Sequence, residues 1–255
     1  MKKNVPKRIL LIVSILLFRL IIFAQNTDSI KVNLDANKEI HFQIKKENPA
    51  YGLSLLWFLP EEQIQKIVGK QFKPIIKDGK GVLMLFIASS EKYFLDNVEF
   101  QNLKIAHILI PVERSLNSVE AFGSEKQKLN LVLNQYDFKP KMAQIELILK
   151  PKNDSISLVA KLSTKKGNLE LSSVFLNQPG DLKSIKSSSI SSPIDSNCYF
   201  MGSESYRPIT IESIKIIHKG KNWISEFNLP LIPDRIWLNQ DFCWDFIFVR
   251  NINTQ

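Results

Sequence analysis

Residues 81–88 read GVLMLFIA, a run that is apolar nearly throughout. A strand with water on one face alternates apolar and polar side chains, whereas this run offers no polar face. Short apolar runs that follow a turn are typical of strands buried on both sides, and the turn residues Asp78 and Gly79 stand just before this one. The sequence therefore predicts a strand here that other parts of the chain cover on both faces.

A short helix is predicted upstream of this strand. Residues 60–69 read PEEQIQKIVG, with proline and two acids in the first turn and glycine at the end. Proline and carboxylates suit the start of a helix, and glycine suits its end. Ile64, Ile67 and Val68 would supply its apolar side.

Strand signals dominate the rest of the chain, because apolar and β-branched runs recur with turn residues between them. The serine-rich segment 178–197 predicts a long exposed loop or a flexible flap, inserted in one domain rather than marking a boundary. We expect strands at about 38–45, 52–58, 81–89, 105–112, 128–133, 143–149, 155–163, 168–175, 209–218, 223–228 and 245–249.

Many short strands and few helices predict a mainly β protein. A closed or nearly closed antiparallel β-barrel with one or two short helices would remove the exposed strand edges, and two packed sheets are the alternative. Residues 25–255 are long enough to form a single domain with a substantial core.

Two lysines stand out in the segment 136–147, YDFKPKMAQIEL. Lys139 and Lys141 flank Pro140, and residues two apart in a strand share a face. Lysine becomes a nucleophile when burial or a second cation lowers its pKa from about 10.4. The pair is therefore a candidate catalytic site, and a solvated strand start is the alternative.

The order of these features resembles the acetoacetate decarboxylase-like β-barrel superfamily. The resemblance covers roughly residues 51–149: the run YGLSLLWFLPEE at 51–62, the turn Asp78-Gly79, the buried strand, the strand that ends in Pro111-Val112, and the lysine motif. It implies a barrel in which Lys141 forms a Schiff base with a β-keto acid.

The resemblance further implies that Lys139 would be the cation beside that Schiff base. The family's glycine before the lysine motif and its acidic residue before the strand ending in Pro-Val are absent here. A barrel that binds a ligand without this chemistry is therefore the competing interpretation.

Other residues are candidates for ligand binding. His107 lies in a predicted strand and could point into a barrel, and Arg207 could hold a carboxylate. Trp57, in the run at 51–62, is an aromatic candidate for contact with a ligand. Residues 242–248 place four aromatic side chains on one face, as core or as a platform for a carbohydrate or hydrophobic ligand.

Several functional classes lack their motifs. The chain has no GxSxG elbow, no glycine-rich phosphate loop and no HExxH, and its three histidines lack metal-ligand spacing. We therefore expect no metal and no cofactor. Whether Cys198 and Cys243 pair stays open.

The N-terminus predicts export. Four basic residues precede a fifteen-residue apolar stretch that ends in Phe23-Ala24-Gln25, the layout of a signal peptide over residues 1–24. An uncleaved membrane anchor is the alternative, although a bilayer span needs about 20 residues. This segment holds five Lys and Arg residues and no acids, so its removal lowers the formal charge from +9 to +4.

A remaining chain of charge +4 with dispersed lysines argues against a nucleic-acid partner, and no membrane partner is expected after cleavage. A homo-oligomer is possible. We expect an exported barrel that binds a small organic acid or other small hydrophobic ligand in its interior. The alternative is a carboxy-lyase-like Schiff-base enzyme that uses Lys141.

Overall fold

The computed structural model describes residues 39–48, 50–113, 115–124, 127–193, 198–221 and 223–250, without the side chains of 186–188. The chain divides into two units, residues 1–33 and 34–255, and all described residues belong to the second. The predicted signal peptide therefore lies outside the described residues. Within the described ranges, no helix has the length and apolar character needed to cross a bilayer.

The described residues form two sheets and three short helices. The helices are α2 (Glu61–Val68), α3 (Leu129–Gln135) and α4 (Trp223–Glu226). The first sheet contains β1 (Ile40–Ile44), β2 (Ala50–Pro60), β3 (Lys80–Leu95), β4 (Val98–Val112), β5 (Ser115–Gly123), β6 (Lys141–Met142), β10 (Lys183–Ser191), β11 (Cys198–Thr210) and β13 (Arg235–Arg250). The second contains β7 (Gln144–Lys152), β8 (Ser155–Ser163), β9 (Gly167–Leu176) and β12 (Lys215–Gly220).

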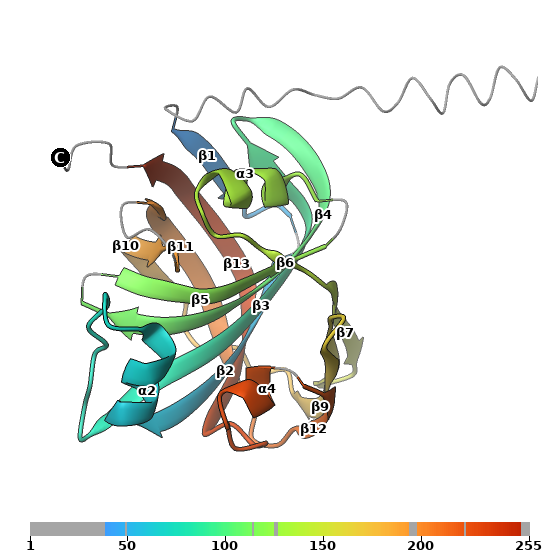
Figure 1. Cartoon of the computed structure of the whole chain (residues 1–255). Helices are drawn as coiled ribbons and strands as arrows, with labels where there is room; N and C mark the ends of the chain where they lie inside the picture. Colours follow the sequence, from blue (N-terminus) through green and yellow to red (C-terminus); the bar gives the residue numbers. More distant parts are fainter. Residues whose placement is uncertain are drawn as a thin grey trace, which may run out of the picture. The chain divides into compact units, whose positions relative to one another are not determined.

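Seven strands of the first sheet form a nearly closed ring in the order β2, β3, β4, β5, β10, β11 and β13, and β13 pairs with β2 again (Figure 1). All neighbours in the ring are antiparallel except β5 and β10, which run parallel and join through only two residue pairs. β13 pairs with β1 as well as with β2 and β11. The prediction of a mainly β, nearly closed barrel is confirmed.

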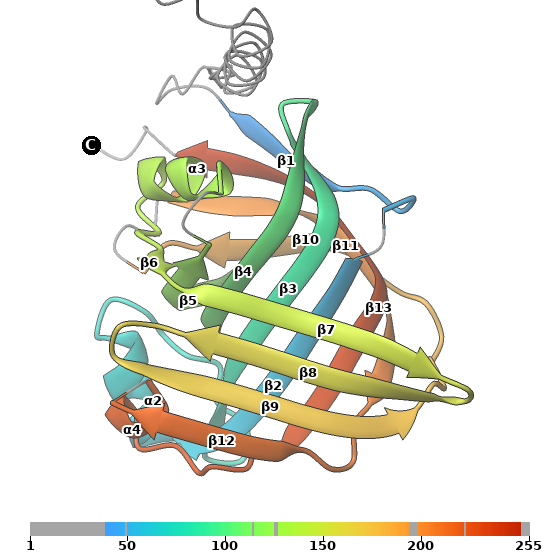
Figure 2. The ribbon, with the colours of Figure 1, turned by 90° about the vertical axis from the view of Figure 1, so that its right-hand side faces the viewer.

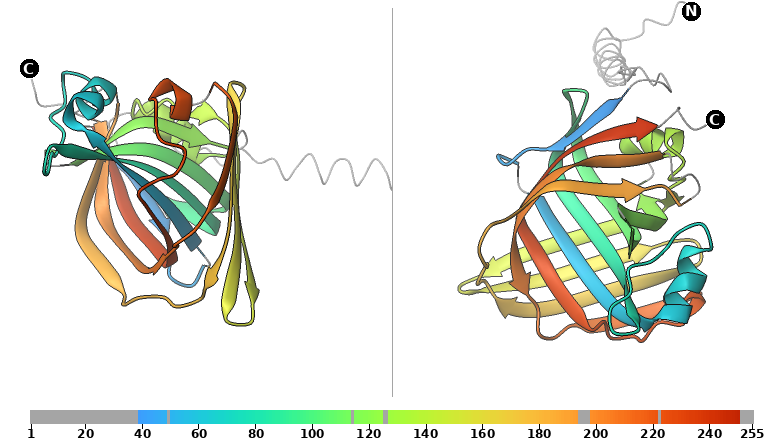
Figure 3. Two further views of the ribbon diagram at one scale, coloured as in Figure 1. Left: turned by 90° about the horizontal axis from the view of Figure 1, so that it is seen from below. Right: turned by 90° about the vertical axis from the view of Figure 1, so that its left-hand side faces the viewer.

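The second sheet covers the outside of the ring. Figure 2 shows its strands lying across β2, β3 and β4. The left panel of Figure 3, a view from below, shows the two sheets facing each other. Leu83, Leu85 and Ile87 of β3 join an inter-sheet cluster of apolar residues with Leu158 of β8. This cluster occupies the space between the ring and the second sheet.

The opposite face of the ring strands points inward. Phe86 and Ala88 of β3 belong to a separate interior cluster, to which β13 contributes the aromatic side chains Phe242, Trp244, Phe246 and Phe248. α3 lies at one end of the ring and adds apolar side chains to the interior cluster (Figure 1). The prediction that residues 81–88 are covered on both faces is therefore confirmed, and the aromatic residues of β13 are core.

Several predicted elements are wrong. Residues 128–133 and 223–228 form helices α3 and α4 instead of strands, and residues 209–218 contain the end of β11 and the start of β12 instead of one strand. Leu129, Val132 and Leu133 are the buried apolar residues of α3, at helical spacing. A short apolar run is compatible with a strand or with a helix, and the sequence alone does not show which of its residues are buried.

The serine-rich segment 178–197 is not a loop throughout, because it contains β10. β10 pairs with β5 on one side and with β11 on the other, so hydrogen bonds from its backbone hold it in place although few of its side chains are apolar. β5 was also missed by the sequence analysis.

Candidate functional site

Lys141 lies on the outside of the ring. It begins β6, where it pairs with Phe122 of β5, and its side chain is 49% exposed. Its Nζ lies 2.5 Å from Oε1 of Glu120, whose side chain is only 14% exposed. Lys141 and Glu120 therefore form an ion pair at the edge of β5.

A cleft of about 360 Å³ surrounds this ion pair. We call it the Lys141 cleft. It lies between β5, β6, the turn from β8 to β9, and α4. Its lining residues are Glu120, Phe122, Lys141, Met142, Thr164, Lys165, Lys166, Trp223 and Glu226.

The cleft combines an apolar floor with a charged rim. Phe122 and Trp223 are buried and form the floor. On the rim, Lys166 Nζ lies 3.0 Å from Glu226 Oε1, and this hydrogen bond raises the pKa of Lys166. Among the described residues, none forms an ion pair with Lys165. Three lysines and two glutamates leave the cleft with an excess of one positive charge.

Lys139 is not part of this cleft. It is exposed, and its φ of 43° lies in the left-handed region. The extended backbone that would place Lys139 and Lys141 on one face is therefore interrupted. Its catalytic role stays a prediction, as does that of Lys141.

His107 points into the interior cluster. Its Nδ1 lies 3.0 Å from the Oγ of Ser118, and its ring packs against Phe138 and Phe200 at centroid distances of 6.3 and 6.2 Å. Burial lowers the pKa of His107 to about 4, so the imidazole is neutral near pH 7. No described residue hydrogen-bonds to its Nε2.

The other two predicted ligand-binding residues lie apart from one another. Trp57 is fully buried in the inter-sheet cluster, where its Nε1 donates a hydrogen bond to the Pro230 carbonyl at 2.9 Å and its ring meets Trp223 edge-on. Arg207 is partly exposed and lies 3.4 Å from the Asp241 carboxylate. Their roles in binding stay predictions.

A smaller cavity of about 100 Å³ lies within the ring. We call it the Glu204 cavity. Glu204 of β11 accepts a hydrogen bond of 3.0 Å from Trp244 Nε1, and Asn239 of β13 also lines the cavity. Neither residue was predicted from the sequence, because no strand was expected over 198–208 or over 235–244. The signal in the sequence was that Phe200, Glu204 and Tyr206 stand at even spacings, which places them on one face of a strand.

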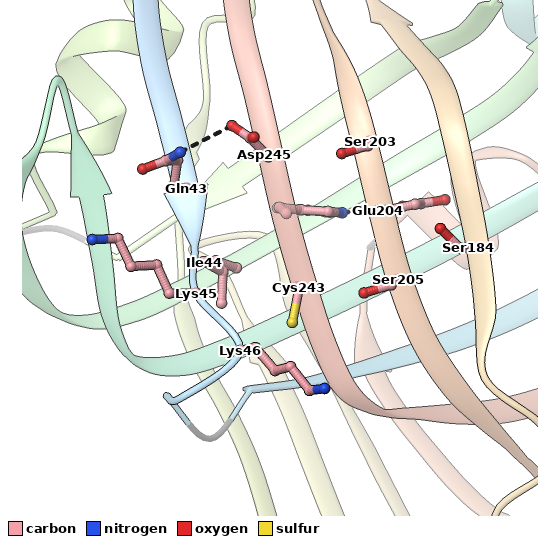
Figure 4. Close-up of a pocket in the computed structure, with 11 residues that line it drawn as sticks. Gln43, Ile44, Lys45, Lys46, Ser184, Ser203, Glu204, Ser205, Cys243 and Asp245 are labelled. Atoms are coloured by element: carbon pink, nitrogen blue, oxygen red, sulfur yellow. Dashed lines mark hydrogen bonds between the residues drawn. The ribbon is translucent and has the colours of Figure 1, made fainter.

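The outer surface of the same strands carries another hollow, of about 310 Å³. Figure 4 shows Ser203, Ser205 and Cys243 lining it beside the hydrogen bond from Gln43 to Asp245, which measures 3.1 Å. Cys198 and Cys243 do not form a disulfide with each other, and burial raises the pKa of the Cys243 thiol.

Metal ligands do not gather in the described part of the chain, where no group of three or more His, Cys, Asp or Glu side chains could hold an ion.

Comparisons with known proteins identify the fold. No family model and no curated protein match the sequence. An acetoacetate decarboxylase-like enzyme from Sphingomonas wittichii RW1 has a similar structure, with 9% identity, a TM-score of 0.56, and coverage of 84% of this chain and 93% of that chain.

The enduracididine biosynthesis enzyme MppR, in a complex with pyruvate, is also similar. It has 9% identity and a TM-score of 0.51, and the match covers 87% of this chain and 92% of that chain. The chain therefore has the fold of acetoacetate decarboxylase-like enzymes, as the order of its sequence features predicts.

Proposed function

We propose that this protein binds a small organic acid in the Lys141 cleft and does not use Lys141 for Schiff-base chemistry. The observation that carries the proposal is a cleft with an apolar floor and one uncompensated positive charge. Ligand sites of this kind combine apolar walls with a few polar groups that fix orientation.

The charge on the rim favours an anion. Glu120 and Glu226 neutralise Lys141 and Lys166, which leaves Lys165 to meet a ligand carboxylate. Phe122 and Trp223 would contact the apolar body of the acid. The similar structure of MppR holds pyruvate, which is an acid of this size class.

The environment of Lys141 argues against a nucleophilic amine. Schiff-base formation requires the neutral amine, which enzymes obtain by burying the lysine or placing a second cation beside it. Lys141 is half-exposed and its close partner is a carboxylate. Among the described residues, neither the burial nor the second cation that such enzymes use is found at Lys141.

Isothermal titration calorimetry tests the binding proposal. Pyruvate, butyrate and benzoate are titrated into the protein and into Lys165→Ala, with Lys161→Ala as a control. Lys161 is a partly exposed lysine on β8 whose Nζ lies 3.8 Å from Glu170 Oε1. Loss of one exposed charge contact, about 1 kcal/mol, should weaken acid binding about fivefold in Lys165→Ala only. The absence of saturable binding by all three acids would overturn the proposal.

Borohydride trapping tests the alternative of a Schiff-base lyase. Protein is incubated with acetoacetate or pyruvate, reduced, and mapped by mass spectrometry. We expect no adduct on Lys141. A stoichiometric adduct there, lost in Lys141→Arg, would establish the enzyme instead of the binding protein.

We also propose that the chain is exported and cleaved after Ala24. The basic residues and apolar stretch before Phe23-Ala24-Gln25 support this. N-terminal sequencing of the protein from its native cells should begin at Gln25. A chain that retains residues 1–24 and sediments with membranes would indicate the uncleaved anchor.

A further inference from the structure

Glu204 is a partly buried carboxylate of the ring, and no described residue forms an ion pair with it, although Lys45 and Lys46 share with it the hollow on the outer surface. Its one hydrogen bond from a described residue comes from Trp244 Nε1, at 3.0 Å. No lysine, arginine or histidine is among the residues that line the Glu204 cavity. Buried carboxylates are normally paired with a cation, because removing an ion from water is costly. Burial accordingly raises the pKa of Glu204, against the effect of the Trp244 hydrogen bond.

Asn239 supplies a second hydrogen-bond acceptor, its side-chain oxygen Oδ1. Its side chain lines the same cavity, the residue is only 4% exposed, and no described residue hydrogen-bonds to its Oδ1. A buried amide oxygen without a partner costs free energy. A ligand that donates hydrogen bonds to both Glu204 and Asn239 would remove both costs.

Aromatic rings form the rest of the wall. Phe242 and Trp244 lie 4.7 Å apart between ring centroids, and Phe86 lies 5.4 Å from Phe242 and 5.5 Å from Trp244. The faces of aromatic rings attract cations, most strongly in sites from which water is excluded. An ammonium group also carries several hydrogen-bond donors and no acceptor.

The size of the cavity limits the ligand. Its volume is about 100 Å³, whereas a buried cavity of about 150 Å³ accommodates benzene. Leu116 and Tyr206, which also line it, are only partly buried, and a ligand would enter past such side chains.

We propose that the Glu204 cavity binds a small protonated alkylamine, with the ammonium group between Glu204 and Asn239 and the alkyl chain against Phe86, Phe242 and Trp244. This site is separate from the Lys141 cleft and has the opposite charge preference.

Calorimetry with three probes of similar size tests the proposal. Propylammonium has both the charge and the N–H donors, 1-propanol lacks the charge, and tetramethylammonium lacks the donors. We expect propylammonium to bind at least about tenfold more tightly than either of the others, because only it satisfies the carboxylate and the amide oxygen together. Equal binding of propylammonium and 1-propanol, or no binding of propylammonium, would overturn the proposal.

Variants then locate the site. Glu204→Gln should weaken propylammonium binding about tenfold or more. Asp245→Asn, which removes an exposed carboxylate from the outer face of the neighbouring strand, should leave it unchanged. The probe comparison on the unaltered protein decides the proposal even if Glu204→Gln fails to fold.

The two proposals fail independently. Lys165→Ala should leave propylammonium binding unchanged, and Glu204→Gln should leave acid binding unchanged. Loss of propylammonium binding in Lys165→Ala, with Glu204→Gln unaffected, would move the amine site to the Lys141 cleft and refute the assignment to Glu204.

Discussion

His107 links the stability of the protein to pH. Its pKa is lowered to about 4 by burial, from 6.5, so the unfolded chain binds a proton between these values while the folded chain does not. The contribution of neutral His107 is complete above about pH 6.5 and is lost as the pH falls toward 4, by as much as about 3 kcal/mol. Urea unfolding from pH 7.5 to pH 4.5 should show this loss, and His107→Leu should reduce it.

The control for this measurement is His218→Gln, which replaces an exposed histidine of β12. Its unfolding at the same pH values shows what the loss of a histidine outside the interior cluster does. If His107→Leu leaves the pH dependence of the unaltered protein unchanged, the folded protein protonates His107 and the neutral state inferred for it is wrong.

Single residues of the site were only partly predictable. The lysine motif directed attention to Lys141, which does line a cleft. The sequence could not reveal Glu120 as its partner, because this pair depends on β6 joining β5, and β5 was not predicted. Glu204 and Asn239 converge from β11 and β13. Neither residue type is informative without that pairing.

Gly202 controls the pairing of β11 and β13. A Cβ atom added at this position would clash with the backbone carbonyl oxygen of Asp245 on β13. A backbone atom cannot move away as a side chain can, so Gly202→Ala would push the two strands apart. We expect a loss of about 2 kcal/mol or more in the free energy of unfolding, measured with urea.

Gly180→Ala is the matched control, because the nearest atom to its added Cβ would be 3.3 Å away. Its free energy of unfolding should change by less than about 1 kcal/mol. Equal losses in the two variants would show that close strand contact at Gly202 does not limit stability.

Elements were predictable where the pattern was long. The helix at 60–69 and the strands at 81–89 and 155–163 correspond to α2, β3 and β8. End signals define the first, a sustained apolar run the second, and alternating apolar residues the third. The prediction was wrong at α3 and α4, because helices of only seven and four residues show too little periodicity to be told from strands. β10 was not predicted, because it is a strand through its pairing with β5 and β11 and not through the pattern of its own side chains.

The ring and the second sheet share one apolar core. The inter-sheet cluster takes residues from β2, β3 and β4 on one side and from β7, β8 and β9 on the other. Leu158→Ala, at a fully buried position of β8, should cost about 2 to 5 kcal/mol. It should lower the midpoint of a single calorimetric transition, because the inter-sheet cluster covers the outer face of the ring as well as the inner face of the second sheet.

Ile148→Ala provides the comparison, since Ile148 of β7 is 42% exposed. Its midpoint should move much less. Two separate transitions in Leu158→Ala would mean that the ring remains folded when the second sheet opens, and that the two sheets do not form one cooperative unit.

The architecture of the whole molecule was more predictable than its parts. The run at 81–88 required cover on both sides, and a ring with an outer sheet provides it. Both alternatives considered from the sequence, a barrel and packed sheets, are present together. The topology of closure could not be inferred, because it depends on β5 and β10, neither of which was predicted from the sequence.

The position of β13 determines when this protein can complete its fold during synthesis. β13 joins β1, β2 and β11, and it supplies four aromatic residues of the interior cluster. β13 leaves the ribosome after the other described strands, so the nascent chain keeps an open sheet and an unfilled interior until β13 has emerged. Chaperones that hold unfolded chains would therefore have a long interval in which to engage it.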